Sequence, residues 1–319
     1  MDFPVPASED ALAGARDSLI HDYLDLFSLT MLYYDQLLTL PAEIAYIWTR
    51  PRSTSSIMFL LNRWLGFAGN LVVATLSLIP FPQEVCSRFN YFRQIMLVIN
   101  EAVVCVILAL RVYALYERTR RVLALFSAVS LLMLGLTGWS LSGQKSTVTQ
   151  YARTGCHMEL TTASGHYLAI PWEMLFVFDC TIFALTVRAT YNAHRQAQGQ
   201  MLADARLPLV TVILRDGAIY FGGMALANLS NILTFHFSPA LLKGCLTTLA
   251  SNLSMLLTSR LMLNMHKHAF LGIMTTTFRS GDTRRTSLRF REGTIRTASD
   301  EQPAHVGDVS DNLASGSSV

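Results

Sequence analysis

The feature that most constrains this chain is a series of long apolar tracts, each with the length of a membrane-spanning helix. A helix needs about 20 mostly apolar residues to cross the hydrocarbon core of a bilayer. Seven tracts reach that length, at residues 23–48, 55–80, 89–116, 122–141, 167–191, 207–235 and 239–265. Only 15% of the 319 residues are charged, whereas soluble domains carry about 25%. The sequence therefore predicts an all-α, polytopic membrane bundle of seven transmembrane helices.

The distribution of positive charge predicts how this bundle is oriented. Lys and Arg concentrate in the cytosolic loops of membrane proteins, and here the loops on the side of the C-terminus carry more of them. We therefore expect an outer N-terminus and a cytosolic C-terminus. The first tract is the weakest, because it contains Asp35, Glu43 and Pro41. Without it, six helices would remain and both termini would share a side.

Composition divides the chain into three parts. Residues 1–22 form a short acidic N-terminal segment, residues 23–268 hold the seven-helix transmembrane domain, and residues 269–319 form a polar tail. The tail is rich in Ser, Thr and Arg and poor in apolar residues, a composition typical of disordered segments. It is therefore predicted to be a disordered cytosolic tail.

Two of the five cysteines are predicted to lie in outer loops. Cys86 precedes the third tract, and Cys156 lies between the fourth and the fifth. The outer compartment is oxidising, so these two form a candidate disulfide, although two separate free thiols would fit the same positions. Cys105, Cys180 and Cys245 fall within tracts and are interpreted as small buried residues. The sequence has no Cys-x-x-Cys pair, so no zinc or other metal is predicted.

The first two tracts contain charged residues that would destabilise the protein in a bilayer unless they are paired or reach its surface. Glu43 lies eight residues before Pro51, and Arg63 lies twelve residues after it. In a helical hairpin the difference of four residues is about 6 Å along the axis, which two long side chains can bridge. The sequence predicts a Glu43–Arg63 ion pair in the cytosolic half. The alternative is that Arg63 reaches the headgroups and Glu43 binds water.

Three further charged residues fall one to two turns deeper than the expected cytosolic helix ends. They are Arg215, Asp216 and Arg260. We expect them to form, with Glu43 and Arg63, a structural ion-pair network that joins several helices. Such a network either holds a switch between conformations or only stabilises the bundle.

Four carboxylic acids fall near the middle of the expected bilayer without an obvious basic residue at the same depth. They are Asp35, Glu101, Glu173 and Asp179. Ionisable residues inside a membrane are candidate functional groups by default. These acids, together with Asn100 and Trp172, are therefore candidates for a ligand or proton site. An equally good interpretation is that the carboxyl groups only hydrogen-bond across helices.

Several stretches of the chain resemble a known family. They are Tyr34-Asp35, Leu38-Thr39-Leu40, Glu43, Ile47-Trp48 and Leu61-Asn62-Arg63-Trp64, followed by residues 110–116 and 259–264. These stretches are similar to a fungal membrane-protein family catalogued as a domain of unknown function, whose N-terminal signature would fall at residues 23–68. Trp64 stands where that family is expected to have Tyr. The resemblance implies a multi-pass integral membrane protein, and it implies no activity and no catalytic residue.

The motifs of common enzymes are missing from the sequence. It contains no HExxH, GxSxG, P-loop or dinucleotide fingerprint, so we expect neither an enzyme nor a bound cofactor. The net charge of +3 and the lack of a basic stripe argue against a nucleic-acid partner.

Receptor-like sensing fits the expected architecture best. Seven helices and a cytosolic tail predict a non-enzymatic receptor that binds an unknown ligand, with a cytosolic signalling partner at its inner loops and tail. This is an argument from fold alone, and no acidic residue precedes Arg111, as the G-protein-coupled motif would require. The alternative is a transporter or proton-linked channel that uses the intramembrane carboxylates. Both the plasma membrane and an endomembrane fit this multi-pass protein.

Overall fold

The computed structural model describes residues 9–49, 53–79, 82–142, 146–148, 158–160, 162–199 and 207–268. These residues lie in one compact unit that ends at His268. They form seven helices: α1 (Glu9–Tyr46), α2 (Thr54–Ser77), α3 (Gln83–Leu115), α4 (Arg120–Ser142), α5 (Thr162–Gly199), α6 (Leu207–Phe237) and a seventh helix at residues 247–268. The all-α prediction is confirmed. The predicted tail, residues 269–319, lies outside the described residues.

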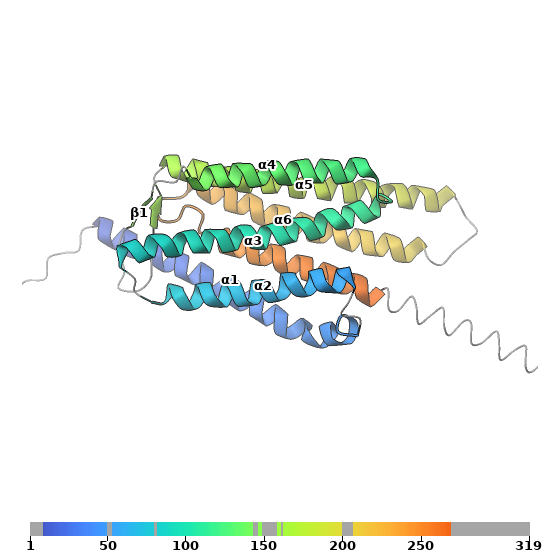
Figure 1. Cartoon of the computed structure of the whole chain (residues 1–319), viewed down its shortest axis with the longest axis horizontal. Helices are drawn as coiled ribbons and strands as arrows, with labels where there is room; N and C mark the ends of the chain where they lie inside the picture. Colours follow the sequence, from blue (N-terminus) through green and yellow to red (C-terminus); the bar gives the residue numbers. More distant parts are fainter. Residues whose placement is uncertain are drawn as a thin grey trace, which may run out of the picture. The chain divides into compact units, whose positions relative to one another are not determined.

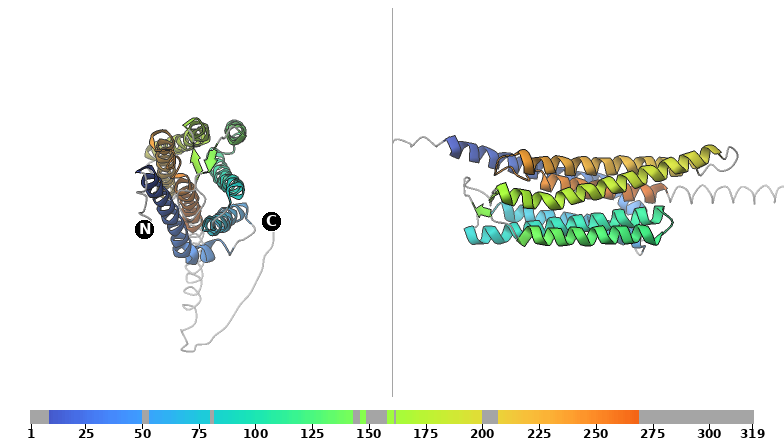
Figure 2. Two further views of the ribbon diagram at one scale, coloured as in Figure 1. Left: turned by 90° about the vertical axis from the view of Figure 1, so that its left-hand side faces the viewer. Right: turned by 90° about the horizontal axis from the view of Figure 1, so that it is seen from above.

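The seven helices lie side by side along the long axis of the bundle (Figure 1). α1 begins at one end, here called the N-terminal end of the bundle, and the seventh helix finishes at the other, the C-terminal end. Because each helix reverses the direction of the one before it, α1, α3, α5 and the seventh helix run parallel. The seventh helix is largely enclosed, with Ala250, Ser251, Thr258 and Leu261 almost fully buried. Seen end-on, it lies among the other helices (Figure 2).

α1 is longer than the sequence predicted. It begins at Glu9 rather than at residue 23. The added turns contain several Ala and Leu residues, which favour helix, and Ser18 within them is buried. Charged residues lowered the hydropathy before residue 23, but charge does not end a helix. The residues from Glu9 onwards therefore continue into the first apolar tract as one helix.

The seventh helix begins at residue 247 and not at the predicted Pro239. Residues 240–246 instead form successive turns. Gly244 has a φ of 72°, a left-handed conformation that interrupts an α-helix and favours glycine. A Cβ at Gly244 would lie 2.5 Å from the ring of Phe235, so the turn packs directly on the end of α6. This packing positions Lys243 at the N-terminal end of the bundle.

A short pair of strands lies between α4 and α5, where the sequence predicted only a loop. β1 (Ser146–Val148) and β2 (Met158–Leu160) are antiparallel, with Thr147 opposite Glu159. Strands of three residues form few ladder hydrogen bonds, so the fold class stays all-α.

Burial in this bundle differs from burial in a soluble protein, because polar residues share the buried core and many large apolar residues are exposed. Glu43 and Asn231 are fully buried, whereas Leu37, Leu131 and Ile219 are 69–72% exposed. Soluble proteins rarely expose contiguous apolar surface of this kind, whereas charged side chains within a bilayer face the interior of the bundle. The pattern is that of helices surrounded by lipid.

Five of the described helices are long and apolar enough to cross a membrane. The segments are Thr54–Ser77, Glu84–Leu115, Arg120–Ser142, Ser164–Asn192 and Gly217–Phe237. α1 and the seventh helix do not meet the same criterion. The structure thus supports a multi-helix membrane protein, while seven spans and their orientation stay predictions.

Candidate functional site

The Glu43–Arg63 pair that the spacing in the first hairpin predicted is present in the structure. Arg63 Nε on α2 lies 2.6 Å from Glu43 Oε2 on α1, and both side chains are almost fully buried. This contact is an ion pair without regular hydrogen-bond geometry. The other Glu43 oxygen accepts a hydrogen bond of 3.1 Å from Trp48 Nε1. Arg63 also donates to Thr39 Oγ1 at 2.8 Å and to the carbonyl of Gln36.

Asp35 has a basic partner, contrary to the prediction from its depth in the sequence. Arg260 Nε on the seventh helix lies 2.6 Å from Asp35 Oδ1 on α1. The prediction was wrong because it compared depths estimated from the ends of separate tracts. Asp35 and Arg260 are brought to the same level by the parallel packing of the first and last helices.

The predicted ion-pair network is therefore present in part. Its described members are Glu43, Arg63 and Arg260, and Arg260 pairs with Asp35, which was predicted for the ligand site instead. We call the two pairs Glu43–Arg63 and Asp35–Arg260 the ion-pair layer. The side chains of Arg215 and Asp216 lie outside the described residues, so their place in the network stays a prediction.

The ion-pair layer is tightly packed around Glu43, Arg63 and Asp35. Asn62 donates to the Met255 carbonyl at 3.1 Å and to Ser259 Oγ at 3.0 Å. A Cβ at Gly66 would lie 2.7 Å from the sulfur of Met255, so α2 and the seventh helix approach closely here. The cavity beside Asp35 has a volume of only about 10 Å³, which is room for one water at most. This layer joins α1, α2 and the seventh helix, and the described cavity in it has no room for a larger ligand.

A larger cavity of about 280 Å³ lies near the N-terminal end of the bundle, between α3, α4, α5 and the turn at residues 240–246. Its apolar wall includes Val98, Val106, Met133, Leu134, Trp172 and Leu175. Its polar residues include His21, Arg93, Glu101, Thr137, Ser140 and Lys243. Ligand sites are mostly apolar clefts of about 300–1,000 Å³ with a few polar groups. The size and lining of this cavity suit a small ligand.

Two of the six residues predicted for a ligand site line this cavity. They are Glu101 and Trp172. The other four, Asp35, Asn100, Glu173 and Asp179, are not among the described residues that line it. Glu173 follows Trp172 directly, and neighbouring residues on a helix point about 100° apart. Its carboxylate lies instead 2.9 Å from His236 Nε2, at a partly exposed position between α5 and α6.

The carboxyl groups of Asp179 and Glu101 lie beside polar residues of neighbouring helices. Asp179 Oδ2 accepts a hydrogen bond of 2.6 Å from Asn228 Nδ2, which links α5 to α6. Glu101 lies beside Ser251 of the seventh helix, but both of its oxygens are buried without a hydrogen bond of regular geometry. Glu101 therefore lines the cavity with its aliphatic stem, while its oxygens are turned away from the open space.

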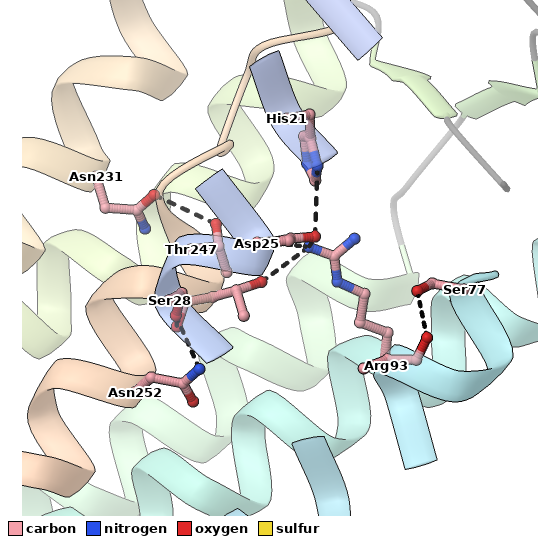
Figure 3. Close-up of polar contacts among 10 residues, drawn as sticks. His21, Asp25, Ser28, Ser77, Arg93, Asn231, Thr247 and Asn252 are labelled. Carbon is pink, nitrogen blue, oxygen red and sulfur yellow. Dashed lines mark hydrogen bonds and ion pairs between the residues drawn. The ribbon is translucent and has the colours of Figure 1, made fainter. Parts of the chain in front are cut away.

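Arg93 connects three helices at the side of the cavity that faces the N-terminal end of the bundle (Figure 3). Its Nη2 lies 3.1 Å from Asp25 Oδ2 on α1 and donates to Thr248 Oγ1 on the seventh helix at 2.9 Å. His21 Nδ1 lies 3.5 Å from the same carboxylate. The sequence analysis missed this cluster. Asp25 and Arg93 are charges inside apolar tracts, so the signal that identified the first ion pair could have found them.

Lys243 is a second cation beside the cavity that the sequence analysis did not single out. Its ammonium group has no carboxylate partner within the described part of the chain. The side chain lies against α5 at Gly165, where a Cβ would come within 2.9 Å of Lys243 Cδ and 3.3 Å of Nζ. The missing side chain of Gly165 makes room for Lys243 beside the cavity.

The cysteines divide into two groups. Cys105, Cys180 and Cys245 are free thiols, whereas Cys86, near the start of α3, is disulfide-bonded. Cys156 lies outside the described residues, so the pairing of Cys86 with Cys156 stays a prediction.

These features describe an all-α bundle in which five helices are long and apolar enough to cross a membrane, with the ion-pair layer nearer one end and a cavity of about 280 Å³ nearer the other. The family of unknown function (DUF6533) matches residues 21–68, which span most of α1 and α2. The match confirms the resemblance to a domain of unknown function at the N-terminal signature, while the fungal origin and the stretches at residues 110–116 and 259–264 stay predictions. The matched segment supplies Asp35, Glu43 and Arg63 to the ion-pair layer. A comparison with curated proteins finds no relative of the chain.

Proposed function

We propose that this protein is a non-enzymatic, receptor-like membrane protein that binds a small amphipathic ligand in the cavity beside Glu101, Trp172 and Lys243. In this proposal all seven helices cross the bilayer, with the N-terminus outside and the C-terminus in the cytosol. The cavity then lies in the outer half, where a sensing protein receives its ligand. The observation that carries the proposal is the cavity of about 280 Å³ with a mostly apolar wall and a cation at one end.

The charges around the cavity indicate the kind of ligand. Arg93 is paired with Asp25, whereas Lys243 has no such partner among the residues described. An unmatched cation attracts an anionic group, and the attraction strengthens where water is scarce. The apolar wall beyond Lys243 suits a hydrocarbon chain, since burying apolar surface is favourable. A ligand with one anionic head and an apolar chain fits both features.

Glu101 does not favour a cationic ligand instead. A cation entering the cavity would have to reach the carboxyl oxygens, and both oxygens are buried away from accessible space. The wall that Glu101 presents to the cavity is its apolar stem.

Binding of tritiated decanoic acid to the full-length protein in lipid nanodiscs tests the proposal. We expect saturable binding that unlabelled decanoate displaces and that 1-decanol, which lacks the charge, displaces about tenfold less well. Substitution K243Q should weaken decanoate binding about tenfold, since a hydrogen bond to a charged group contributes about 1.5–3 kcal/mol. Empty nanodiscs measure partitioning of the acid into lipid.

Lys267, which is exposed near the C-terminal end of the seventh helix, provides the matched control. K267Q makes the same change of charge far from the cavity and should bind decanoate as the wild type does. If decanoate, decanol and decyltrimethylammonium all bind without saturation, the cavity is not a ligand site.

The proposed orientation of the protein in the membrane can be tested by protease accessibility. Tags at residue 1, within residues 142–166 and at residue 319 can be probed with protease on intact cells. We expect cleavage of the first two tags on intact cells and of the third only after permeabilisation. A first and a third tag on the same side would contradict an odd number of spans.

A transporter or proton-linked channel is the second candidate. The observation that favours it is the placement of two carboxyl groups, Glu101 and Asp179, in the interior of the bundle. Reconstitution into liposomes with an internal pH-sensitive dye separates the two candidates. Protein-dependent movement of protons or decanoate would favour transport, whereas saturable binding without movement supports the receptor.

A further inference from the structure

Beyond the ligand cavity, side chains with oxygen atoms gather in the middle of the bundle. They come from four helices: Glu101 on α3, Asp179 on α5, Asn228 on α6, and Ser251 and Ser254 on the seventh helix. Asp179, Asn228, Ser251 and Ser254 are each at most 4% exposed. We call these five residues the core oxygen cluster.

Contacts link four of the five members in two pairs. Asp179 Oδ2 accepts the 2.6 Å hydrogen bond from Asn228, and Glu101 lies beside Ser251. The two carboxyl groups are also close enough to interact electrostatically. Three helices that flank the seventh therefore direct polar groups towards one level of the bundle.

The register between α6 and the seventh helix completes the cluster. These helices are antiparallel. Thr247 donates a hydrogen bond to Asn231 near one end, and Thr258 donates one to the sulfur of Met224 further along. Asn228 lies between Asn231 and Met224 on α6. It therefore faces the stretch between Thr247 and Thr258, which contains both serines of the cluster.

Most of the oxygen atoms in the cluster lack a regular hydrogen bond within the described part of the chain. Among the described residues, both oxygens of Glu101, Oδ1 of Asn228 and the hydroxyl groups of Ser251 and Ser254 are buried without a hydrogen bond of regular geometry. The Ser251 hydroxyl nevertheless lies beside the Glu101 carboxyl group, so Asn228 Oδ1 and the Ser254 hydroxyl are the cluster oxygens without a neighbouring partner in the part of the chain that the structure describes. Buried polar groups are nearly always satisfied, so an orphaned group indicates an unseen water or ion. Several orphaned oxygens at one level indicate a shared ligand.

No basic side chain of the described residues pairs with these carboxyl groups. Arg93, eight residues before Glu101 on α3 and thus about 12 Å along the helix, is already bonded to Asp25. Arg111 is ten residues further along, or about 15 Å, and lies over the ring of Phe221. A negative charge on one of the two carboxyl groups therefore has no basic side chain beside it among the described residues, and one monovalent cation would balance it if the other carboxyl group is protonated.

From this arrangement we infer that the core oxygen cluster binds one small monovalent cation, Na⁺. Oxygen ligands without nitrogen or sulfur select hard cations. Calcium sites generally use several carboxylates among six to eight oxygens, whereas this cluster has two carboxyl groups and otherwise neutral oxygens. The inference goes beyond the proposed ligand site, although Glu101 contributes its stem to the cavity and its oxygens to the cluster.

The thermal unfolding of the purified full-length protein tests the inference. The midpoint is followed by tryptophan fluorescence at one pH in NaCl, KCl or choline chloride of equal concentration. A cation that binds only the folded protein raises the midpoint in proportion to the logarithm of its concentration. We expect NaCl to raise the midpoint by about 3 °C or more over choline chloride, with a smaller effect of KCl.

Two variants show whether the effect comes from the cluster. E101Q and S251A should lose the difference between NaCl and choline chloride. E173Q, which changes the partly exposed acid bonded to His236, should keep it. Saturable binding of ²²Na⁺ to the wild-type protein, at one ion per chain, gives a readout that does not depend on the folding of any variant.

Each other outcome overturns the inference. Equal midpoints in the three salts together with no saturable ²²Na⁺ binding would mean that only water fills the cluster. Stronger stabilisation by KCl or by CaCl₂ would assign the cluster to a different ion. A sodium effect that persists in E101Q and S251A would place the ion elsewhere.

Discussion

Arg260 Nε lies 2.6 Å from Asp35 Oδ1, although the two residues are 225 positions apart in the sequence. Ser28 and Asn252, which are 224 positions apart, are also hydrogen-bonded, at 2.8 Å. The nearly constant separation means that α1 and the seventh helix lie parallel with a fixed register. The ion-pair layer thus fastens the hairpin of α1 and α2 to the last helix of the bundle.

The effects of removing Glu43 and of removing Arg63 on stability should not be additive. Removing one partner leaves the other charge buried alone, which costs about 3–5 kcal/mol in buried ion pairs. E43Q and R63Q should each lower the thermal midpoint and the yield of monodisperse protein, and the double variant should lose less than the sum of the two. E84Q, at an exposed position on α3, serves as the control. Strictly additive losses would mean that the two side chains act independently.

The Asp35–Arg260 pair should respond unequally to the loss of its two partners. Asp35 is 6% exposed, whereas Arg260 is 41% exposed. In R260Q the buried carboxylate loses its ion-pair partner, whereas in D35N the arginine can turn towards the surface. R260Q should therefore lower the thermal midpoint more than D35N does. The opposite order would contradict the burial on which this prediction depends.

Gly244 should not tolerate a side chain. Its φ of 72° costs other residues about 1–2 kcal/mol, and a Cβ would collide with Phe235 at 2.5 Å. G244A should lower the thermal midpoint and weaken decanoate binding, because the turn that carries Lys243 is displaced. G135A is the matched control, since nothing lies within 4 Å of a Cβ at Gly135. Equal thermal midpoints and equal decanoate binding in G244A and G135A would show that the turn accepts a side chain without loss of stability.

The predicted disulfide can be tested by peptide mapping. Proteolysis of the unreduced protein after alkylation should release one cross-linked species that contains Cys86 and Cys156. Cys105, Cys180 and Cys245, the free thiols of the described helices, should be recovered as alkylated peptides if the protein is unfolded first. Recovery of alkylated Cys156 would exclude the pairing.

The helices could be predicted because the signals for them are local. Each apolar tract needs only its own length and composition to reveal a helix. The Glu43–Arg63 pair could also be predicted, since both residues are counted from one short turn. The same local signals mispredicted the ends of the helices. The seventh helix starts at residue 247 and not at Pro239, because Gly244 has a left-handed backbone conformation and packs against Phe235.

Which residues line the cavity could not be predicted from any single tract, because it depends on how the helices are rotated against each other. Trp172 lines the cavity while its neighbour Glu173 bonds to His236, and this difference follows from the rotation of α5 against α4 and α6.

The sequence alone determined the membrane class, the helices and the pairing within the first hairpin, because hydropathy and short spacings act over neighbouring residues. Only the tertiary structure decided that Asp35 meets Arg260, that Arg93 meets Asp25 and which acids face the cavity. These contacts depend on the order and rotation of packed helices, which arise from the whole bundle at once.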